Sequence, residues 1–291
     1  MKYVYPPNAA ISVKLGPPAT KGSETPEPTV PTITLHDGVE IPQLGLGVSQ
    51  VPPAETQSAV EHALDIGYRH IDTVAPHRNE TAVGAALANA NLPRQEVFVT
   101  SKLWSAQQGY DSTLRAFEVI LSRLGFECID LCLIHAQVAG ESCFVDTWRA
   151  LERILEEGRA RTVGVWGFRI EDLEQLEAET DTRPTVHQVD LHPRLQQVEL
   201  RKWHAEYRIA TEAWSPLAQR DLLADKTIGE VASRHGKTPA QTILRWHMQL
   251  GNIAIPQSAT AEQNRENIEI FDFELSDEEM AVFTGGQRLE L

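Results

Sequence analysis

Residues 97–135 read VFVTSKLWSAQQGYDSTLRAFEVILSRLGFECIDLCLIH, and this stretch decides the predicted fold. Two short runs of apolar and β-branched residues, 97–103 and 129–135, are typical of buried strands. Apolar residues between them recur at helical spacing, and we expect Asp111 to cap this helix at its start and Gly125 at its end. A strand, a helix and a second strand in this order predict a parallel βαβ unit.

The same alternation continues on both sides of this unit. A first strand is predicted over 44–48 (LGLGV), and further strands over 69–72, 161–166, 185–191, 209–215 and 252–258. Residues 144–158 (FVDTWRALERILEEG) predict another amphipathic helix. About eight such repeats predict an α/β fold, a (β/α)8 TIM barrel. No GxGxxG or P-loop motif follows the first strand, so a doubly wound nucleotide-binding fold is less well supported.

The N-terminal part of the chain differs from the rest. Residues 1–31 are rich in Pro, Gly, Ser and Thr and read as an extension without a core of its own, whereas 32–291 form a single barrel domain. Two short strands flank Asp37 and Gly38, where glycine permits the positive φ of a tight turn. We therefore expect an N-terminal β-hairpin, lying across the barrel floor.

The composition excludes several classes of function. The net charge is −15, from 26 basic and 41 acidic residues, which argues against nucleic acid or anionic membranes as partners. No apolar run approaches the roughly 18 residues of a membrane span, and no signal peptide is present, so a cytoplasmic protein is expected. Cys128, Cys132 and Cys143 lack metal-ligand spacing and are predicted to be free thiols, with no metal site. No heptad pattern suggests an obligate assembly, so a monomer or weak homo-oligomer is expected.

Polar residues at the ends of the predicted strands are the candidates for chemistry, because (β/α)8 barrels carry their sites there. Asp72, Lys102 and His135 each end or closely follow a strand core, in three consecutive repeats. We expect them to converge, and a carboxylate beside a lysine favours the charged forms of both. These three residues are therefore predicted to be catalytic.

From residue 32 onward the chain resembles the aldo-keto reductases, in particular the bacterial branch that reduces small carbonyl compounds. The resemblance is carried by collinear motifs that include GYRHIDT (67–73), VFVTSKLW (97–104), QVDLHP (188–193) and IATEAWSPL (209–217). It implies hydride transfer from NADPH to a carbonyl, with a tyrosine as proton donor, tuned by a lysine and an aspartate, and a histidine that orients the substrate. Asp72, Lys102 and His135 match three of these positions, and the tyrosine position falls on His77.

The resemblance also assigns the cofactor positions. It implies that Trp214 stacks on the nicotinamide, that Gln188 contacts the carboxamide, and that the pyrophosphate and adenine are lined by Ser215, Leu217, Ser258 and Asn267. Five positions depart from the family pattern. Trp166 and Gly167 replace a Ser-Asn pair, His187 replaces an asparagine, and Gln257 and Gln263 replace the lysine and arginine that bind the phosphate of NADPH. These departures predict weakened or lost NADPH binding, whereas NADH needs neither cation.

Three functions remain open at the level of sequence. In the first, Asp72, His77, Lys102 and His135 perform acid–base chemistry, such as isomerisation, cyclisation or elimination, on a small carbonyl or enol compound without a cofactor. In the second, the chain is an NADPH- or NADH-dependent carbonyl reductase with His77 in place of the tyrosine. In the third, it binds a small molecule without catalysis. A further hypothesis places residues 1–31 across the barrel mouth, over the cofactor groove.

Overall fold

A parallel barrel forms the centre of the molecule. The computed structural model describes residues 13–14, 30–49, 51–74, 79–135, 143–218, 222–258 and 260–283. Eight strands lie side by side in chain order, each parallel to its neighbours. They are β4 (Leu46–Gly47), β5 (His70–Asp72), β6 (Phe98–Leu103), β7 (Ile129–His135), β8 (Ala160–Trp166), β9 (Val186–Asp190), β10 (Ala210–Trp214) and β11 (Ile253–Ile255).

The first and last strands of this order close the barrel. Parallel bridges join Leu44 to Ala254 and Gly47 to Gln257, and the Gly47 amide donates to the Pro256 carbonyl at 3.1 Å. Buried apolar side chains form three clusters, and the largest combines residues of the barrel strands with residues of the surrounding helices. The predicted (β/α)8 TIM barrel is therefore confirmed.

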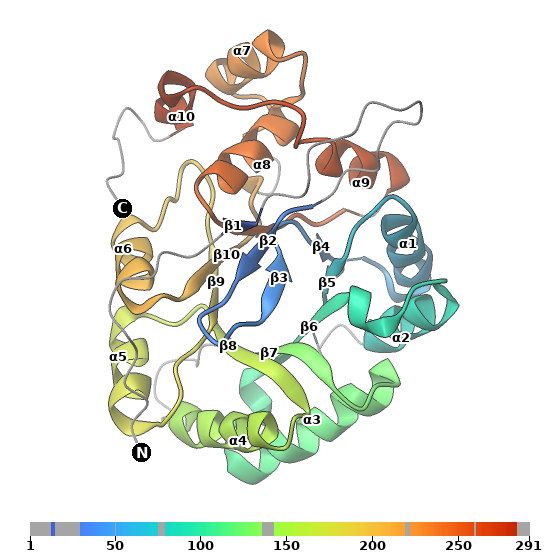
Figure 1. The fold of residues 1–291 in the computed structure, drawn as a ribbon, viewed down its shortest axis with the longest axis vertical. Helices are drawn as coiled ribbons and strands as arrows, with labels where there is room; N and C mark the ends of the chain where they lie inside the picture. The colour runs from blue at the N-terminus through green and yellow to red at the C-terminus, as the bar shows by residue number, and fades with distance from the viewer. Residues whose placement is uncertain are drawn as a thin grey trace.

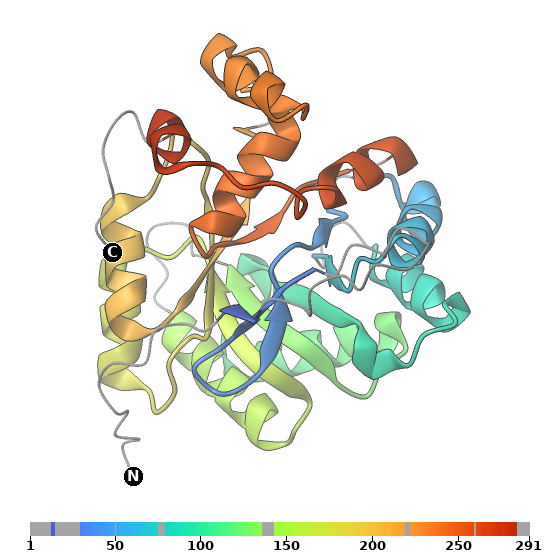
Figure 2. The same ribbon diagram turned by 45° about the horizontal axis from the view of Figure 1, so that its top comes forward.

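Helices surround the ring of strands (Figure 1). Those that follow barrel strands in sequence are α1 (Pro53–Asp65), α2 (Glu80–Asn89), α3 (Tyr110–Leu124), α4 (Phe144–Glu156), α5 (Ile170–Glu179), α6 (Val198–Tyr207), α8 (Pro239–Gln249) and α9 (Ala261–Ile268), with short 3-10 turns at Arg94–Glu96 and Ser105–Gln107. Two more helices, α7 (Lys226–Arg234) and α10 (Asp277–Phe283), pack on α8 outside the ring (Figure 2). Among the described helices, none combines the length and the apolar character that crossing a membrane requires.

The predicted ends of α3 are partly correct. Gly125 ends the helix in the left-handed conformation, with φ of 72°, as expected. Asp111 is not the N-cap, because the helix begins at Tyr110 and Gly109 is its N-cap. Gly109 has φ of 102°, and its backbone amide donates to Thr147 Oγ1 on α4 at 2.7 Å.

The hairpin of β2 (Thr32–Thr34) and β3 (Glu40–Pro42) covers the N-terminal ends of the barrel strands. Its turn is the predicted one, since Gly38 has φ of 90° and the Val39 amide donates to Asp37 Oδ1 at 3.0 Å. The apolar side chains of the hairpin pack against the first residues of β6, β9, β10 and β11: Phe98, Val186, Ala210 and Ile253. In Figure 1 it lies over the centre of the ring. The hairpin is therefore the barrel floor.

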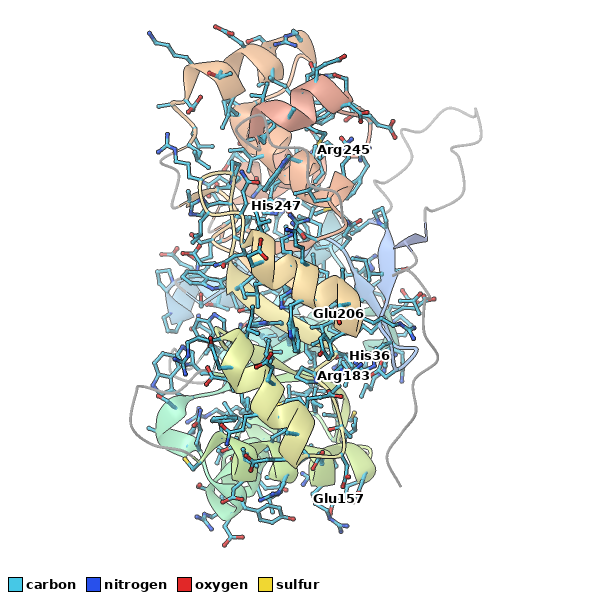
Figure 3. All side chains as sticks on the ribbon, turned by 90° about the vertical axis from the view of Figure 1, so that its left-hand side faces the viewer. His36, Glu157, Arg183, Glu206, Arg245 and His247 are labelled. Carbon is cyan, nitrogen blue, oxygen red and sulfur yellow. The ribbon has the colours of Figure 1, made fainter. Side chains whose placement is uncertain are left out.

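Contacts around His36 anchor the hairpin. His36 Nε2 donates to the Pro184 carbonyl at 3.2 Å, just before β9, and Figure 3 shows His36 next to Arg183. Burial lowers the pKa of His36 below its usual value. A neutral imidazole there is consistent with a hydrogen bond donated to a carbonyl.

The described part of the N-terminal extension lies at the floor. Strand β1 (Val13–Lys14) pairs antiparallel with β2, with Val13 opposite Ile33. The hypothesis that the extension covers the barrel mouth is therefore wrong for these two residues, because a strand added to the hairpin stays at the opposite end of the barrel. Residues 1–12 and 15–29 lie outside the described residues.

Candidate active site

A buried ion pair stands at the carboxyl ends of β5 and β6. Lys102 Nζ donates to Asp72 Oδ1 and to the Thr73 carbonyl, the latter at 3.2 Å. Both side chains are 4% exposed. Neighbouring parallel strands bring the two residues together, because Asp72 on β5 lies opposite Thr100 on β6, two residues before Lys102. The predicted meeting of Asp72 with Lys102 is present in the structure.

Gln188 on β9 reaches the same ion pair from across the barrel. Its amide nitrogen donates to Asp72 Oδ2 at 3.0 Å and to Glu212 Oε2 at 2.7 Å. The two hydrogens of one amide group are thus shared between two carboxyl groups. The amide of Gln188, a predicted cofactor contact, orients Asp72 in this structure.

Glu212 on β10 is a site residue that the sequence analysis missed. It is fully buried, and burial, reinforced by the negative charge of Asp72, raises its pKa to about 8. Glu212 is therefore protonated at neutral pH, so the cluster carries one positive and one negative charge. The available signal was a lone glutamate inside the otherwise apolar run IATEAW.

His70 on β5 completes the buried cluster on the floor side of the ion pair. Its Nε2 lies 3.7 Å from Glu212 Oε1 and 3.1 Å from Thr100 Oγ1. Burial lowers the pKa of His70 to about 3, so the ring is neutral. His70 therefore adds no charge to the cluster.

Four rings, which we call the mouth rings, lie above the ion pair: Trp104, His135, Trp166 and Trp214. All are half-buried. The centroid of the Trp166 ring is 4.0 Å from that of His135 and 6.1 Å from that of Trp214, both in edge-to-face geometry. Trp104 lies 4.6 Å from His135, and Lys102 Nζ lies 5.7 Å from the Trp166 ring. Trp166 therefore connects the predicted catalytic residues with the predicted cofactor residue Trp214.

The positions of His135 and Trp104 bear on the sequence predictions. The His135 ring contacts Trp166, and the Trp166 ring lies 5.7 Å from Lys102 Nζ, so Trp166 links the two predicted catalytic residues. Trp104, which follows β6, was missed, although its position directly after a strand end was a signal. His77 lies within 75–78, outside the described residues, so its predicted catalytic role stays a prediction.

A cavity of about 310 Å³ adjoins the mouth rings at Trp214. Six of the predicted cofactor positions line it: Trp214, Ser215, Leu217, Gln257, Gln263 and Asn267. Ser258 Oγ lies 3.5 Å from Gln263 Oε1. Ser215 has φ of 51°, a conformation that non-glycine residues rarely adopt and that is common at ligand sites. The structure thus gathers residues at or just after the ends of β10 and β11, together with residues of α9, around one hollow.

His187 lies apart from this cavity. Its Nε2 accepts from the Phe168 amide at 3.1 Å, and its Nδ1 lies 2.8 Å from His204 Nε2 on α6. Burial lowers the pKa of His187 to about 3. The neighbouring Gly167, with φ of 72°, donates its amide to the Gln188 carbonyl at 2.9 Å. The side chain at 187 therefore belongs to the packing between β9 and α6.

Two wider depressions of about 450 Å³ each lie away from the strand ends. One is at the floor beside Glu40 and Arg69, and the other is formed by α1, α8 and α9. Across the described ranges, no three His, Cys, Asp or Glu side chains are grouped so that they could hold a metal ion. The strand ends and the adjoining cavity are therefore the candidate site.

Comparison with known proteins assigns the family. The sequence profile of the Aldo/keto reductase family matches residues 42–285. Because this match covers most of the chain, the protein belongs to the aldo/keto reductase family.

Individual relatives agree over most of their lengths. An aldo-keto reductase from Mycolicibacterium smegmatis is 51% identical over 262 residues, which are 89% of this chain and 95% of that protein. A glyoxal reductase from Bacillus subtilis is 45% identical over 250 residues, 86% of this chain and 90% of that protein. The structure of a Gox0644 mutant in complex with NADPH has a TM-score of 0.85 at 40% identity and covers 89% of this chain and 94% of that one.

Proposed function

We propose that this protein reduces small carbonyl compounds with a nicotinamide cofactor, and that Asp72, His77, Lys102 and His135 are its catalytic residues. The observation that carries the proposal is the buried Asp72–Lys102 pair beneath rings that lead directly into the 310 Å³ cavity. The relatives support it, since they include a glyoxal reductase and a structure in complex with NADPH.

The cavity fits the nucleoside end of a dinucleotide. Its lining combines the Trp214 ring and Leu217 with the hydroxyl of Ser215 and the amides of Asn267 and Gln263. Such a mixture of apolar faces and a few polar groups is typical of ligand sites. A bound nicotinamide cofactor supplies a hydride; this chain's residues hold it and handle the proton.

The charges at the strand ends suit a carbonyl substrate. Lys102 keeps a positive charge just below the mouth, in a place with little water, where it favours negative charge that develops on a carbonyl oxygen. His135, half-buried among the mouth rings, would donate a hydrogen bond to that oxygen. His77 would transfer the proton as an imidazolium. Glu212 accepts a hydrogen bond from Gln188, Gln188 donates another to Asp72, and Asp72 holds Lys102.

The test begins with binding. Protein freed of nucleotide is titrated with NADH and NADPH by calorimetry and tryptophan fluorescence, because Trp214 would report a ring bound against it. Consumption of the bound cofactor is then followed with glyoxal and methylglyoxal as probes. Lys102→Met should keep binding and lose reduction, whereas the matched Lys202→Met, at an exposed lysine on α6, should keep both. Absence of binding for both nucleotides rejects the proposal.

A second candidate is favoured by the position of Trp166. Its ring lies between His135 and Trp214, and Trp166 stands where the family has a side-chain partner for the carboxamide. If this ring keeps nicotinamide out, the same charged cluster would transfer protons on a carbonyl or enol compound without hydride. The test is deuterium uptake from heavy water next to the carbonyl of a small hydroxycarbonyl compound, followed by NMR without cofactor. No uptake above the Lys102→Met background rejects this candidate.

A further inference from the structure

The cavity beside Trp214 has an unusual charge for a site that would hold phosphate. Among the described residues that line it, none is a lysine or an arginine. Its polar groups are the neutral side chains of Ser215, Gln257, Gln263 and Asn267, together with the carboxylate of Glu266. The whole chain adds to this negative balance, with a net charge of −15.

Three cations that lie near the cavity in sequence and within the described ranges make their contacts elsewhere. Arg265, next to Glu266 on α9, lines the separate depression formed by α1, α8 and α9. Lys237, just before α8, binds Asp272 at 2.7 Å and the Glu269 carbonyl at 3.1 Å. Arg245, labelled in Figure 3 on α8, lies 3.4 Å from Glu274. Lys237 and Arg245 thus pair with carboxyl groups outside the cavity lining, and Arg265 is not among the residues that line the cavity.

The polar groups of the cavity are themselves partly engaged. The amide of Gln257 donates to Ser49 Oγ at 2.6 Å, and Glu266 Oε1 accepts from Thr238 Oγ1 at 2.5 Å. At the N-terminus of α9, the backbone amide of Gln263 donates to Thr260 Oγ1 at 3.3 Å. A helix end offers only about half a positive charge, and here one of its amides is already bonded. Among the described lining residues, a phosphate dianion would therefore meet a carboxylate and no compensating side-chain cation.

We propose that this cavity binds the adenosine half of an unphosphorylated dinucleotide and selects against a 2′-phosphate, so that NADH rather than NADPH is the cofactor. The chemistry is the one that doubly wound dinucleotide folds use: an acidic residue accepts a hydrogen bond from the ribose 2′-hydroxyl, whereas an arginine accommodates the 2′-phosphate. Glu266 takes the first role. The inference rests on the proposed function for its choice of a dinucleotide.

The experiment uses two probes that lack nicotinamide. ADP-ribose and 2′-phospho-ADP-ribose are each titrated into the full chain by calorimetry. We expect ADP-ribose to bind at least about tenfold tighter, because one charge-assisted contact is worth about a factor of ten or more. The variant Q257K/Q263R should reverse the order, and Glu266→Gln should reduce the preference. A control, Q95K/Q175R, adds the same charges at the floor and on α5 and should leave the preference unchanged.

Two outcomes overturn the inference. Equal or tighter binding of 2′-phospho-ADP-ribose shows that the cavity does not discriminate, and absence of binding for both probes shows that it does not take adenosine. Failure of the proposed function looks different. In that case ADP-ribose binds with the expected preference, yet NADH is not oxidised by any carbonyl probe.

Discussion

The catalytic candidates Asp72 and Lys102 depend on residues that never reach the mouth. Gln188 and Glu212 bond to Asp72 or to one another beneath the surface, and Glu212 is protonated because burial and Asp72 oppose its charge. A neutral acid beside one ion pair avoids a second uncompensated buried charge. At this scale, the site is a balance of charges among buried side chains.

Removing Lys102 should break that balance. In Lys102→Met, the Asp72 carboxylate stays buried without a counter-ion, so we expect a loss of about 3–5 kcal/mol in the free energy of unfolding. Urea unfolding measures it. The double variant D72N/K102M should recover part of the loss, because no charge is then left unpaired. Equal stability of the single variant and the native protein would contradict the prediction.

The pH dependence of stability should reveal Glu212. Its pKa is raised in the folded state from 4.5 to about 8, so the folded protein holds this proton more tightly than the unfolded chain. Stability from this group is complete below 4.5 and is lost as the pH rises to about 8. Relative to Glu212→Gln, the native protein should therefore become less stable across that interval. A stability difference that stays constant with pH would show that Glu212 does not titrate as described.

At the scale of elements, close approach of the outer helices sets which residues are tolerated. Gly84 on α2 faces the Leu124 carbonyl at the end of α3, where an added Cβ would overlap backbone atoms. Gly229 on α7 has nothing within 4 Å of the same position. A side chain larger than hydrogen is therefore excluded at Gly84 by the contact with α3, whereas at Gly229 there is room for one.

A matched pair of substitutions tests this difference. Gly84→Ala should destabilise the protein by about 1–3 kcal/mol, because α2 and α3 must move apart. Gly229→Ala should stabilise it by about 0.5–1 kcal/mol, since alanine loses less conformational freedom in a helix. Urea unfolding of both variants provides the measurement. If both changes have the same sign, the contact between α2 and α3 is not as tight as described.

At the scale of the whole molecule, the two ends of the barrel have separate roles. The floor is an apolar plug from the hairpin, with Ile33 and Ile41 fully buried, whereas the mouth holds the charges and the rings. The hairpin and the mouth rings contact different residues of the barrel. Floor and mouth should therefore respond independently to substitution.

Ile41→Ala tests this independence. The cavity left under the barrel should cost about 2–5 kcal/mol of stability, measured by urea unfolding. Affinity for ADP-ribose should stay within about twofold at temperatures where the variant is folded, because distant sites without shared partners behave additively. A large loss of affinity in folded protein would show that the floor and the cavity are coupled.

The order of elements was predictable from the sequence because it depends on local patterns. Apolar periodicity located the strands and most helices, and the Asp37-Gly38 turn located the hairpin. The meeting of Asp72 with Lys102 followed from the rule that parallel strands end at the same face. The predicted N-cap of α3, Asp111, was wrong. The N-cap Gly109 donates its amide to Thr147 on another helix, and the local sequence does not reveal that contact.

The direction of each side chain was decided only by the tertiary structure. Gln188 and His187 are neighbours on β9, yet Gln188 points inward to Asp72, 116 residues away in sequence, and His187 points outward to His204 on α6. Successive residues of a strand face opposite sides of the sheet. A register shift of one residue would therefore turn each inward side chain of β9 outward to the helices, and each outward one inward. The family motifs fixed the sequence positions of Glu212, Trp166 and Gln257, but the closure and register of the barrel determined which of them share a site.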